Sequence, residues 1–191
     1  MRSPLDTLSR PRFANHPLDI GDGASIPPGD TPAAIWPHDT DALITVIETR
    51  FHAVHRRELP DLVRLARQVE ASHKAHPAAP PGLADLLQRI EWDLEAHMQK
   101  EEQGLFPSMR HDEPPAPAAI ALMLDDHEEH AANLQRLVWL TGDFSIPENA
   151  CPTWRALYAG ARKLAGDLVE HIRIENDVLF PRFAAQPVPG P

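Results

Sequence analysis

The chain has 191 residues and a formal net charge of −10, so it can form one domain with a real core and carries no excess of basic residues. The acidic balance argues against nucleic acids and anionic lipid surfaces as partners. With one cysteine, Cys151, and no long apolar run, the chain cannot form an internal disulfide or a cysteine-rich metal cluster, and it is expected in the cytoplasm, without a membrane span.

The two ends of the chain differ in composition from the region between them. Residues 1–37 are rich in proline and glycine and show neither helical nor alternating apolar periodicity, so they are expected to form an irregular arm. The last residues, 184–191, are expected to be a frayed tail. The predicted domain therefore spans residues 38–183.

The first half of this domain contains two stretches with apolar residues at spacings of three and four, the pattern typical of amphipathic helices. The first begins near Asp39 and runs to about Ser72, with a kink or interruption expected at Pro60. The second runs from Leu83 to a stop expected at Pro107. A short turn separates the two, so they are predicted to form a helical hairpin.

The second half repeats this arrangement, with one helical stretch over residues 120–140 and another from Leu157 to Pro181. Trp92, Trp139, Trp154 and Met123 lie at helical spacing and are expected in the core. Because no segment resembles a strand and the joints are short, the sequence predicts an all-α fold, an antiparallel up-down four-helix bundle.

Two stretches of eleven residues resemble each other: HMQKEEQGLFP, from His97 to Pro107, and HIRIENDVLFP, from His171 to Pro181. In each, a Glu follows the His by four residues, which gives the pairs His97 with Glu101 and His171 with Glu175. Residues four apart project from one face of a helix, and here that face also carries the apolar stripe. The two pairs are therefore expected to point into the core.

The first helix of each predicted hairpin carries a His-x-x-His motif: His52 and His55 in the first, His127 and His130 in the second. His52 precedes His97 by 45 residues, and His127 precedes His171 by 44, so the chain repeats one hairpin with pseudo-twofold character. Spacing alone does not decide which histidine of each motif faces the two His-Glu pairs.

Buried imidazoles and carboxylates need partners, and bound cations would satisfy all of them together. Carboxylate oxygen with imidazole and no thiolate favours iron or manganese, although zinc also accepts such ligands. Two glutamates at related positions are suited to bridge two metals, so we expect a dinuclear site. Glu102 has no acidic counterpart in the second stretch, where Asn176 stands at the matching position, so it is expected to be a solvated charge. The Leu-Phe-Pro endings are expected to be packing and helix stops.

The order and spacing of these motifs over residues 39–183 resemble the haemerythrin-like di-iron proteins of the repair-of-iron-centres family. The resemblance implies two non-haem iron ions, oxo- or hydroxo-bridged, in a four-helix bundle. It selects as metal ligands His52, His97, Glu101, His127, His171 and Glu175, and no catalytic residue distinct from these. Longer family members carry an N-terminal domain with a Cys-Cys pair, which the arm of this chain does not contain.

The resemblance also implies a function in the nitrosative and oxidative stress response. The centre is expected to bind, and to reduce, nitric oxide, and to protect or repair iron–sulfur clusters in the cytoplasm. The implied partners are nitric oxide or dioxygen, damaged iron–sulfur proteins and an electron donor. Two alternatives are a module that reversibly binds oxygen or senses redox state, and a donor of iron for cluster assembly.

Overall fold

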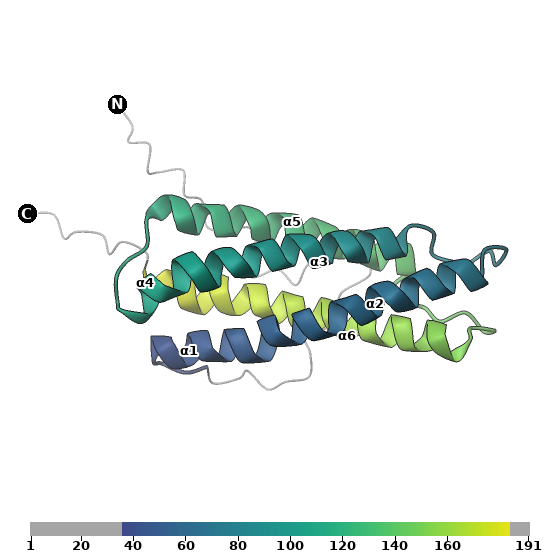
Figure 1. The fold of residues 1–191 in the computed structure, drawn as a ribbon, viewed down its shortest axis with the longest axis horizontal. Helices are drawn as coiled ribbons and strands as arrows, with labels where there is room; N and C mark the ends of the chain where they lie inside the picture. The colour runs from purple at the N-terminus through teal and green to yellow at the C-terminus, as the bar shows by residue number, and fades with distance from the viewer. Residues whose placement is uncertain (1–35, 184–191) are drawn as a thin grey trace, which may run out of the picture.

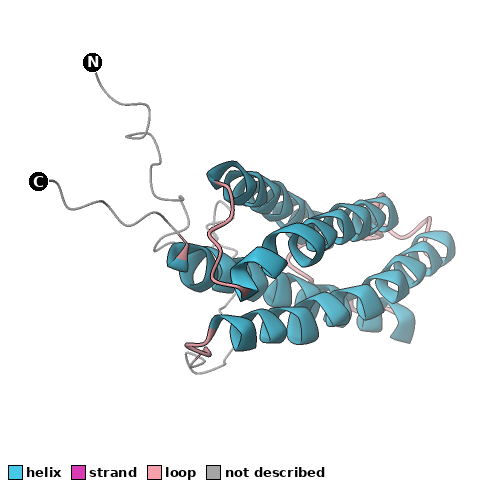
Figure 2. Ribbon diagram, turned by 60° about the vertical axis from the view of Figure 1, so that its left-hand side comes forward, coloured by secondary structure: helices cyan, strands magenta, loops and turns pink. Residues whose placement is uncertain are grey.

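The computed structural model describes residues 36–183, so the predicted tail and nearly all of the predicted arm lie outside the described residues. Within this range every regular element is helical, and four long helices lie side by side (Figures 1 and 2). The prediction of an all-α four-helix bundle is therefore confirmed.

Three of the four bundle helices are composite, because a short π-helical turn continues directly from one helical element. In chain order the elements are α1 (Thr40–Val46), the π turn Ile47–His52 and α2 (Ala53–Ser72); α3 (Leu83–Lys100), the π turn Glu101–Leu105 and α4 (Phe106–Arg110); α5 (Pro117–Thr141); and α6 (Pro152–Ile174), the π turn Glu175–Leu179 and the 3₁₀ turn Phe180–Arg182.

The four bundle helices form a closed ring. Helix α2 packs on α3 and α6, while α5 packs on α3 and α6 from the other side. Short loops join consecutive bundle helices, which makes the neighbours antiparallel (Figure 1). The first bundle helix begins where the Asp39 side chain accepts a 2.8 Å hydrogen bond from the backbone N–H of Ala42.

The helix stop expected at Pro107 is wrong, because the second bundle helix continues past this residue to Arg110. At Pro60 the sequence predicts a kink or an interruption, and the second of these is wrong, because helix α2 runs through Pro60 without a break. Pro107 lies just after a π turn, where the hydrogen-bond register of the helix changes, so a residue that cannot donate is tolerated there. The fourth bundle helix ends next to Pro181, with the 3₁₀ turn that closes at Arg182.

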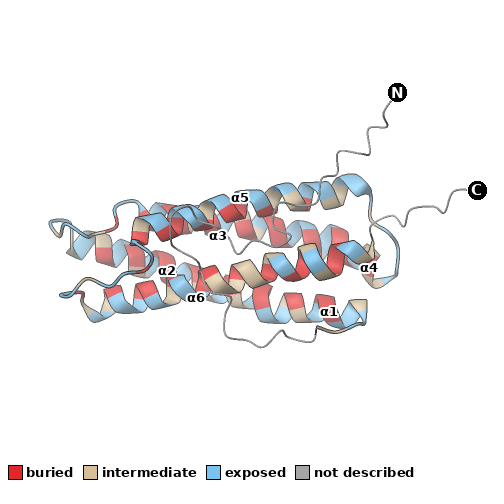
Figure 3. Cartoon of the chain, turned by 180° about the vertical axis from the view of Figure 1, so that it is seen from behind, coloured by how far each residue is buried: buried red, intermediate tan, exposed pale blue. Residues whose placement is uncertain are grey.

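A layer of buried polar side chains divides the core into two apolar clusters. The larger cluster lies among α2, α3, α5 and α6, and the smaller one lies at the end of the bundle that contains α1 and α4. Buried positions line the inward faces of all four bundle helices (Figure 3). The polar layer consists of eight residues that are at most 2% exposed: His52, His55, His97, Glu101, His127, His130, His171 and Glu175.

The large side chains expected in the core follow the prediction only in part. Trp154 and Met123 are buried, at 0% and 3% exposure. Trp92 and Trp139 are 68% and 75% exposed, so their assignment to the core is wrong. Each lies on the outer face of its helix, where helical spacing alone does not distinguish it from the inward stripe.

Candidate metal centre

Six side chains of the polar layer bring their donor atoms together in two overlapping groups. The first group is His52, Glu101, His171 and Glu175, and the second is His97, Glu101, His127 and Glu175. Within each group one donor atom per residue lies within 4.8 Å of all the others. Both carboxylates belong to both groups, as residues that bridge two ions would. These are the six residues selected from the sequence; their role as ligands stays a prediction.

The four imidazoles of these groups turn their Nε2 atoms inward. Nε2 of His52 lies 3.1 Å from Nε2 of His171, and Nε2 of His97 lies 3.2 Å from Nε2 of His127. Two nitrogens that each bind one ion at about 2.1 Å lie no more than about 4.2 Å apart. The paired nitrogens are therefore close enough to bind a common ion.

The two glutamates lie between the histidine pairs. Oε1 of Glu175 is 2.9 Å from Nε2 of His171, and its Oε2 is 3.0 Å from Nε2 of His127. Oε2 of Glu101 is 3.4 Å from Nε2 of both His52 and His97. Each carboxylate thus contacts one histidine of each group.

Several donor atoms at the centre of the layer have no partner of their own. Both carboxylate oxygens of Glu101 and Nδ1 of His171 are buried without a hydrogen bond to any described residue. Buried carboxylates without partners are costly, and a bound cation would satisfy them. Carboxylate oxygens, imidazole nitrogens and unsatisfied buried atoms therefore fit a metal site of the kind that the sequence predicts.

Burial and mutual repulsion set the protonation of this layer. Burial, followed by the neighbouring Glu175, raises the pKa of Glu101 well above 4.5. Burial would also raise the pKa of Glu175, but the imidazoles of His171 and His127 outweigh it and hold that pKa well below 4.5. Desolvation lowers the pKa of His52 to about 4 and that of His97 to about 3. These two imidazoles are therefore neutral at pH 7, the form that binds metals.

The outward Nδ1 atoms of two histidines contact the residues that directly follow Glu101 and Glu175. Nδ1 of His52 lies 2.7 Å from Glu102, and Nδ1 of His127 lies 2.8 Å from Asn176. Such contacts fix the orientation of a ligand histidine and leave Nε2 for the metal. The expectation that Glu102 is a solvated charge is therefore wrong, and Asn176 is its structural counterpart.

The carboxylate of Asp126, which the sequence analysis does not identify, contacts His97 as Glu102 contacts His52. Nδ1 of His97 lies 3.2 Å from Oδ2 of Asp126, which also accepts a 2.8 Å hydrogen bond from Lys100. Arg56 binds Glu102 in the same manner, at 2.7 Å. The only sequence signal for Asp126 is its place directly before a ligand candidate.

The π turns and the phenylalanines of the Leu-Phe-Pro endings lie at the buried polar layer. Two π turns begin at Glu101 and Glu175, and the third ends at His52. The phenylalanines that follow the two later turns stack on histidines: Phe106 on His52 at 5.8 Å between ring centroids, and Phe180 on His127 at 5.9 Å. Both phenylalanines are buried, so the packing role expected for them is confirmed.

The remaining histidine of each His-x-x-His motif lies outside both donor groups. His55 and His130 are buried, and their rings contact His171 and His97 at centroid distances of 5.5 and 5.0 Å. The geometry therefore places the first histidine of each motif among the converging donors, in agreement with the family resemblance.

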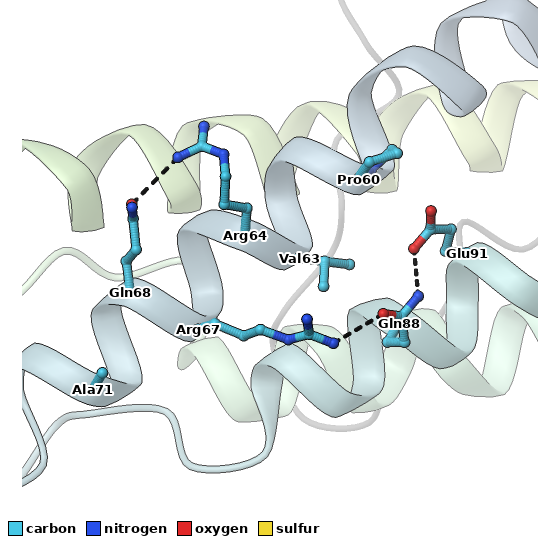
Figure 4. A pocket seen from close by; sticks show the side chains of 8 residues that line it. All are labelled: Pro60, Val63, Arg64, Arg67, Gln68, Ala71, Gln88 and Glu91. Atoms are coloured by element: carbon cyan, nitrogen blue, oxygen red, sulfur yellow. Dashed lines mark hydrogen bonds between the residues drawn. The ribbon is translucent and has the colours of Figure 1, made fainter.

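The surface pocket between α2 and α3 is separate from this layer. Its volume is about 490 Å³, and it contains none of the converging donors. Its polar side chains bond to each other, as Arg67 does to Gln88 at 3.0 Å (Figure 4). Among residues 36–183, the converging donor atoms therefore lie in the buried layer and not in this pocket.

A four-helix bundle whose core holds two overlapping sets of imidazole and carboxylate donors defines a metal-binding protein. Comparison with known families agrees, because residues 44–183 match the model described as the hemerythrin HHE cation binding domain. The chain belongs to this family, which confirms the family resemblance of the motifs.

Three similar proteins carry the name iron-sulfur cluster repair protein YtfE. The protein from Dickeya chrysanthemi is 44% identical over 141 residues, which cover 73% of this chain and 64% of the relative. The protein from Edwardsiella ictaluri is 41% identical over 143 residues, covering 74% and 65%. The protein from Yersinia pseudotuberculosis is 43% identical over 141 residues, covering 73% and 64%. The matching part thus spans less than two thirds of each relative.

None of the helices in residues 36–183 is long and apolar enough to cross a membrane.

Proposed function

We propose that this chain is a cytoplasmic non-haem di-iron protein of the stress response that binds nitric oxide and protects or repairs iron–sulfur clusters. The observation that carries the proposal is the pair of overlapping donor groups that share Glu101 and Glu175. The names of the similar proteins, which refer to iron–sulfur cluster repair, support it.

The residues of the chain have distinct tasks in this proposal. The carboxylates of Glu101 and Glu175 would be shared by the two ions and would offset part of their charge. The imidazoles of His52, His97, His127 and His171 would complete the protein ligands. Iron bound there supplies one-electron redox chemistry and open coordination positions for a small molecule. The two apolar clusters on either side keep bulk water away.

Metal analysis with a nitric oxide titration tests the proposal. The protein, purified without added metal, should contain about two irons per chain. In the reduced, oxygen-free protein, the visible spectrum should change with each addition of nitric oxide until a stoichiometric amount is present. An unchanged spectrum would rule out nitric oxide binding, and an iron content far from two would rule out the di-iron centre.

Delivery of iron to damaged clusters is a second candidate function. It is favoured by a difference among the four histidines. Nδ1 of His52, His97 and His127 each contacts a side-chain oxygen, whereas Nδ1 of His171 is buried without a partner among the described residues, so His171 would bind iron less tightly. The discriminating experiment mixes the iron-loaded protein with an iron–sulfur protein that lacks its cluster. Iron transfer without nitric oxide would favour delivery, whereas a stable oxygen adduct would favour a reversible oxygen carrier.

A further inference from the structure

The two donor groups define two metal positions that can be compared residue by residue. We call the position between His52 and His171 position A, and the position between His97 and His127 position B. Glu101 and Glu175 belong to both positions, so the carboxylates do not distinguish them. Any difference must come from the histidines and from what holds them.

One histidine in each position is supported in a similar way. In position A, Nδ1 of His52 contacts the carboxylate of Glu102, which Arg56 also binds. In position B, Nδ1 of His97 contacts the carboxylate of Asp126, which Lys100 also binds. Each carboxylate is shared with one cation, so these supports are alike in kind.

The second histidine of each position differs in whether its Nδ1 atom has a hydrogen-bond partner. Nδ1 of His127, in position B, lies 2.8 Å from Oδ1 of Asn176. Nδ1 of His171, in position A, is buried and has no hydrogen-bond partner among the described residues. The ring of His171 instead stacks on Phe51, with 5.3 Å between centroids and 4° between planes.

Comparison of the two hairpins shows that His171 lacks the carboxylate partner that its counterpart, His97, has. In the second hairpin, the residue before the ligand candidate His127 is Asp126, which holds His97. The matching residue of the first hairpin, directly before His52, is Phe51, and it lies against His171. An aromatic ring thus occupies the place where the other half of the bundle has a carboxylate.

This substitution affects how tightly His171 binds a metal. A histidine that binds through Nε2 keeps its proton on Nδ1, and an acceptor at Nδ1 both orients the ring and makes it a better ligand. Loss of such a partner typically lowers metal affinity about 10–100-fold. Position A has one such partner and position B has two.

We propose that the two metal positions are unequal: the ion at position A, between His52 and His171, binds about 10–100-fold more weakly and is released first, while the ion at position B is retained. The inference rests on the proposed di-iron centre and deepens it, because it names the position from which iron leaves the protein.

Release of ferrous iron to a coloured chelator tests the inference. The full chain, loaded with two ferrous ions without oxygen, is mixed with excess chelator, and the absorbance of the iron–chelator complex is followed. We expect two phases of one iron each, with rates that differ about 10–100-fold. A single phase that releases both irons would overturn the inference and leave the di-iron proposal intact, whereas an initial content below two irons would count against the di-iron proposal itself.

Two variants assign the phases to the positions. Asn176→Leu removes the partner of His127, so the slow phase should accelerate about 10–100-fold toward the fast one. Glu102→Leu removes the partner of His52, so only the fast phase should accelerate. Asp177→Leu, on the exposed side of the same π turn as Asn176, is the matched control and should leave both rates unchanged. An Asn176→Leu protein in which only the fast phase changes would reverse the assignment and overturn the proposal.

Discussion

Both carboxylate oxygens of Glu101 are buried in the polar layer without a hydrogen bond to the described residues. A group in this state destabilises the metal-free fold by about 1–3 kcal/mol. The carboxylate of Glu101 belongs to both donor groups, so it lowers the stability of the metal-free fold and would supply a ligand when metal is bound. Stability and metal binding therefore make opposite demands on this residue.

Glu101→Leu should separate these two demands. Leucine is apolar and of similar size, so the metal-free variant should be more stable than the wild type by about 1–3 kcal/mol. The variant should gain little stability from ferrous iron, because both donor groups lose a shared ligand. Urea unfolding without oxygen, with and without iron, measures both effects.

The exposed Glu128, on α5, provides the control for this substitution. Glu128→Leu should change the free energy of unfolding by less than about 0.5 kcal/mol and should keep the stabilisation by iron. If Glu101→Leu destabilises the metal-free protein and iron still stabilises it, Glu101 is a structural residue and not a ligand.

The residues that converge were predictable from the sequence, and those that support them were not. His97 with Glu101, and His171 with Glu175, were predictable because residues four apart share a helix face. The choice of His52 over His55 required the family resemblance, because both histidines are buried in the same layer. The support of His52 by Glu102 depends on a contact between two bundle helices, which spacing along one helix does not reveal.

At the scale of the elements, the four bundle helices follow from apolar periodicity, whereas the π turns do not. A π turn alters the hydrogen-bond register over one turn and leaves the apolar pattern on either side nearly intact. The turn Glu101–Leu105 also allows the helix to continue past Pro107, which by ordinary rules ends a helix. The ordinary rule for proline therefore fails at Pro107, next to the polar layer.

Pro60 gives a testable prediction at this scale. It is exposed within α2, where proline lacks a backbone donor and costs about 3 kcal/mol relative to alanine. Proline also restricts the unfolded chain, which offsets about 0.4–1 kcal/mol of this cost. Pro60→Ala should therefore stabilise the protein by about 2 kcal/mol, as measured by urea unfolding.

Pro77, exposed in the turn between α2 and α3, is the matched control. Pro77→Ala should leave stability unchanged or lower it slightly, because only the effect on the unfolded chain remains. A loss of stability in Pro60→Ala would show that the proline fits a helix already distorted at that point.

For the whole molecule, the buried histidines make stability depend on pH. Burial, the largest cause, lowers the pKa of His52 to about 4 and that of His97 to about 3, while an ordinary histidine has a pKa of 6.5. Between these values the two histidines bind more protons in the unfolded chain than in the folded protein, so their contribution to the stability of the metal-free fold is lost as pH falls from 6.5 toward 4. Above pH 6.5 this contribution is fully present.

Urea unfolding of the metal-free protein at intervals from pH 7.5 to 5 measures this dependence before most carboxylates titrate. The midpoint should fall steadily below pH 6.5, and His52→Leu should make the fall less steep. A midpoint that stays constant over this range would show that these histidines are not held neutral by the fold.

The division of the core has a consequence for cooperativity. Each apolar cluster is smaller than the single core that a bundle of this length would otherwise have, and several buried polar atoms in the layer between them lack a partner in the metal-free protein. In amide hydrogen exchange, the metal-free protein should open first at the end that contains α1 and α4, while the larger cluster stays closed. Bound metal should join both ends into one unfolding unit. The ions would then couple the unfolding of the two ends of the bundle. Loss of iron would remove this coupling and allow the end with α1 and α4 to open alone.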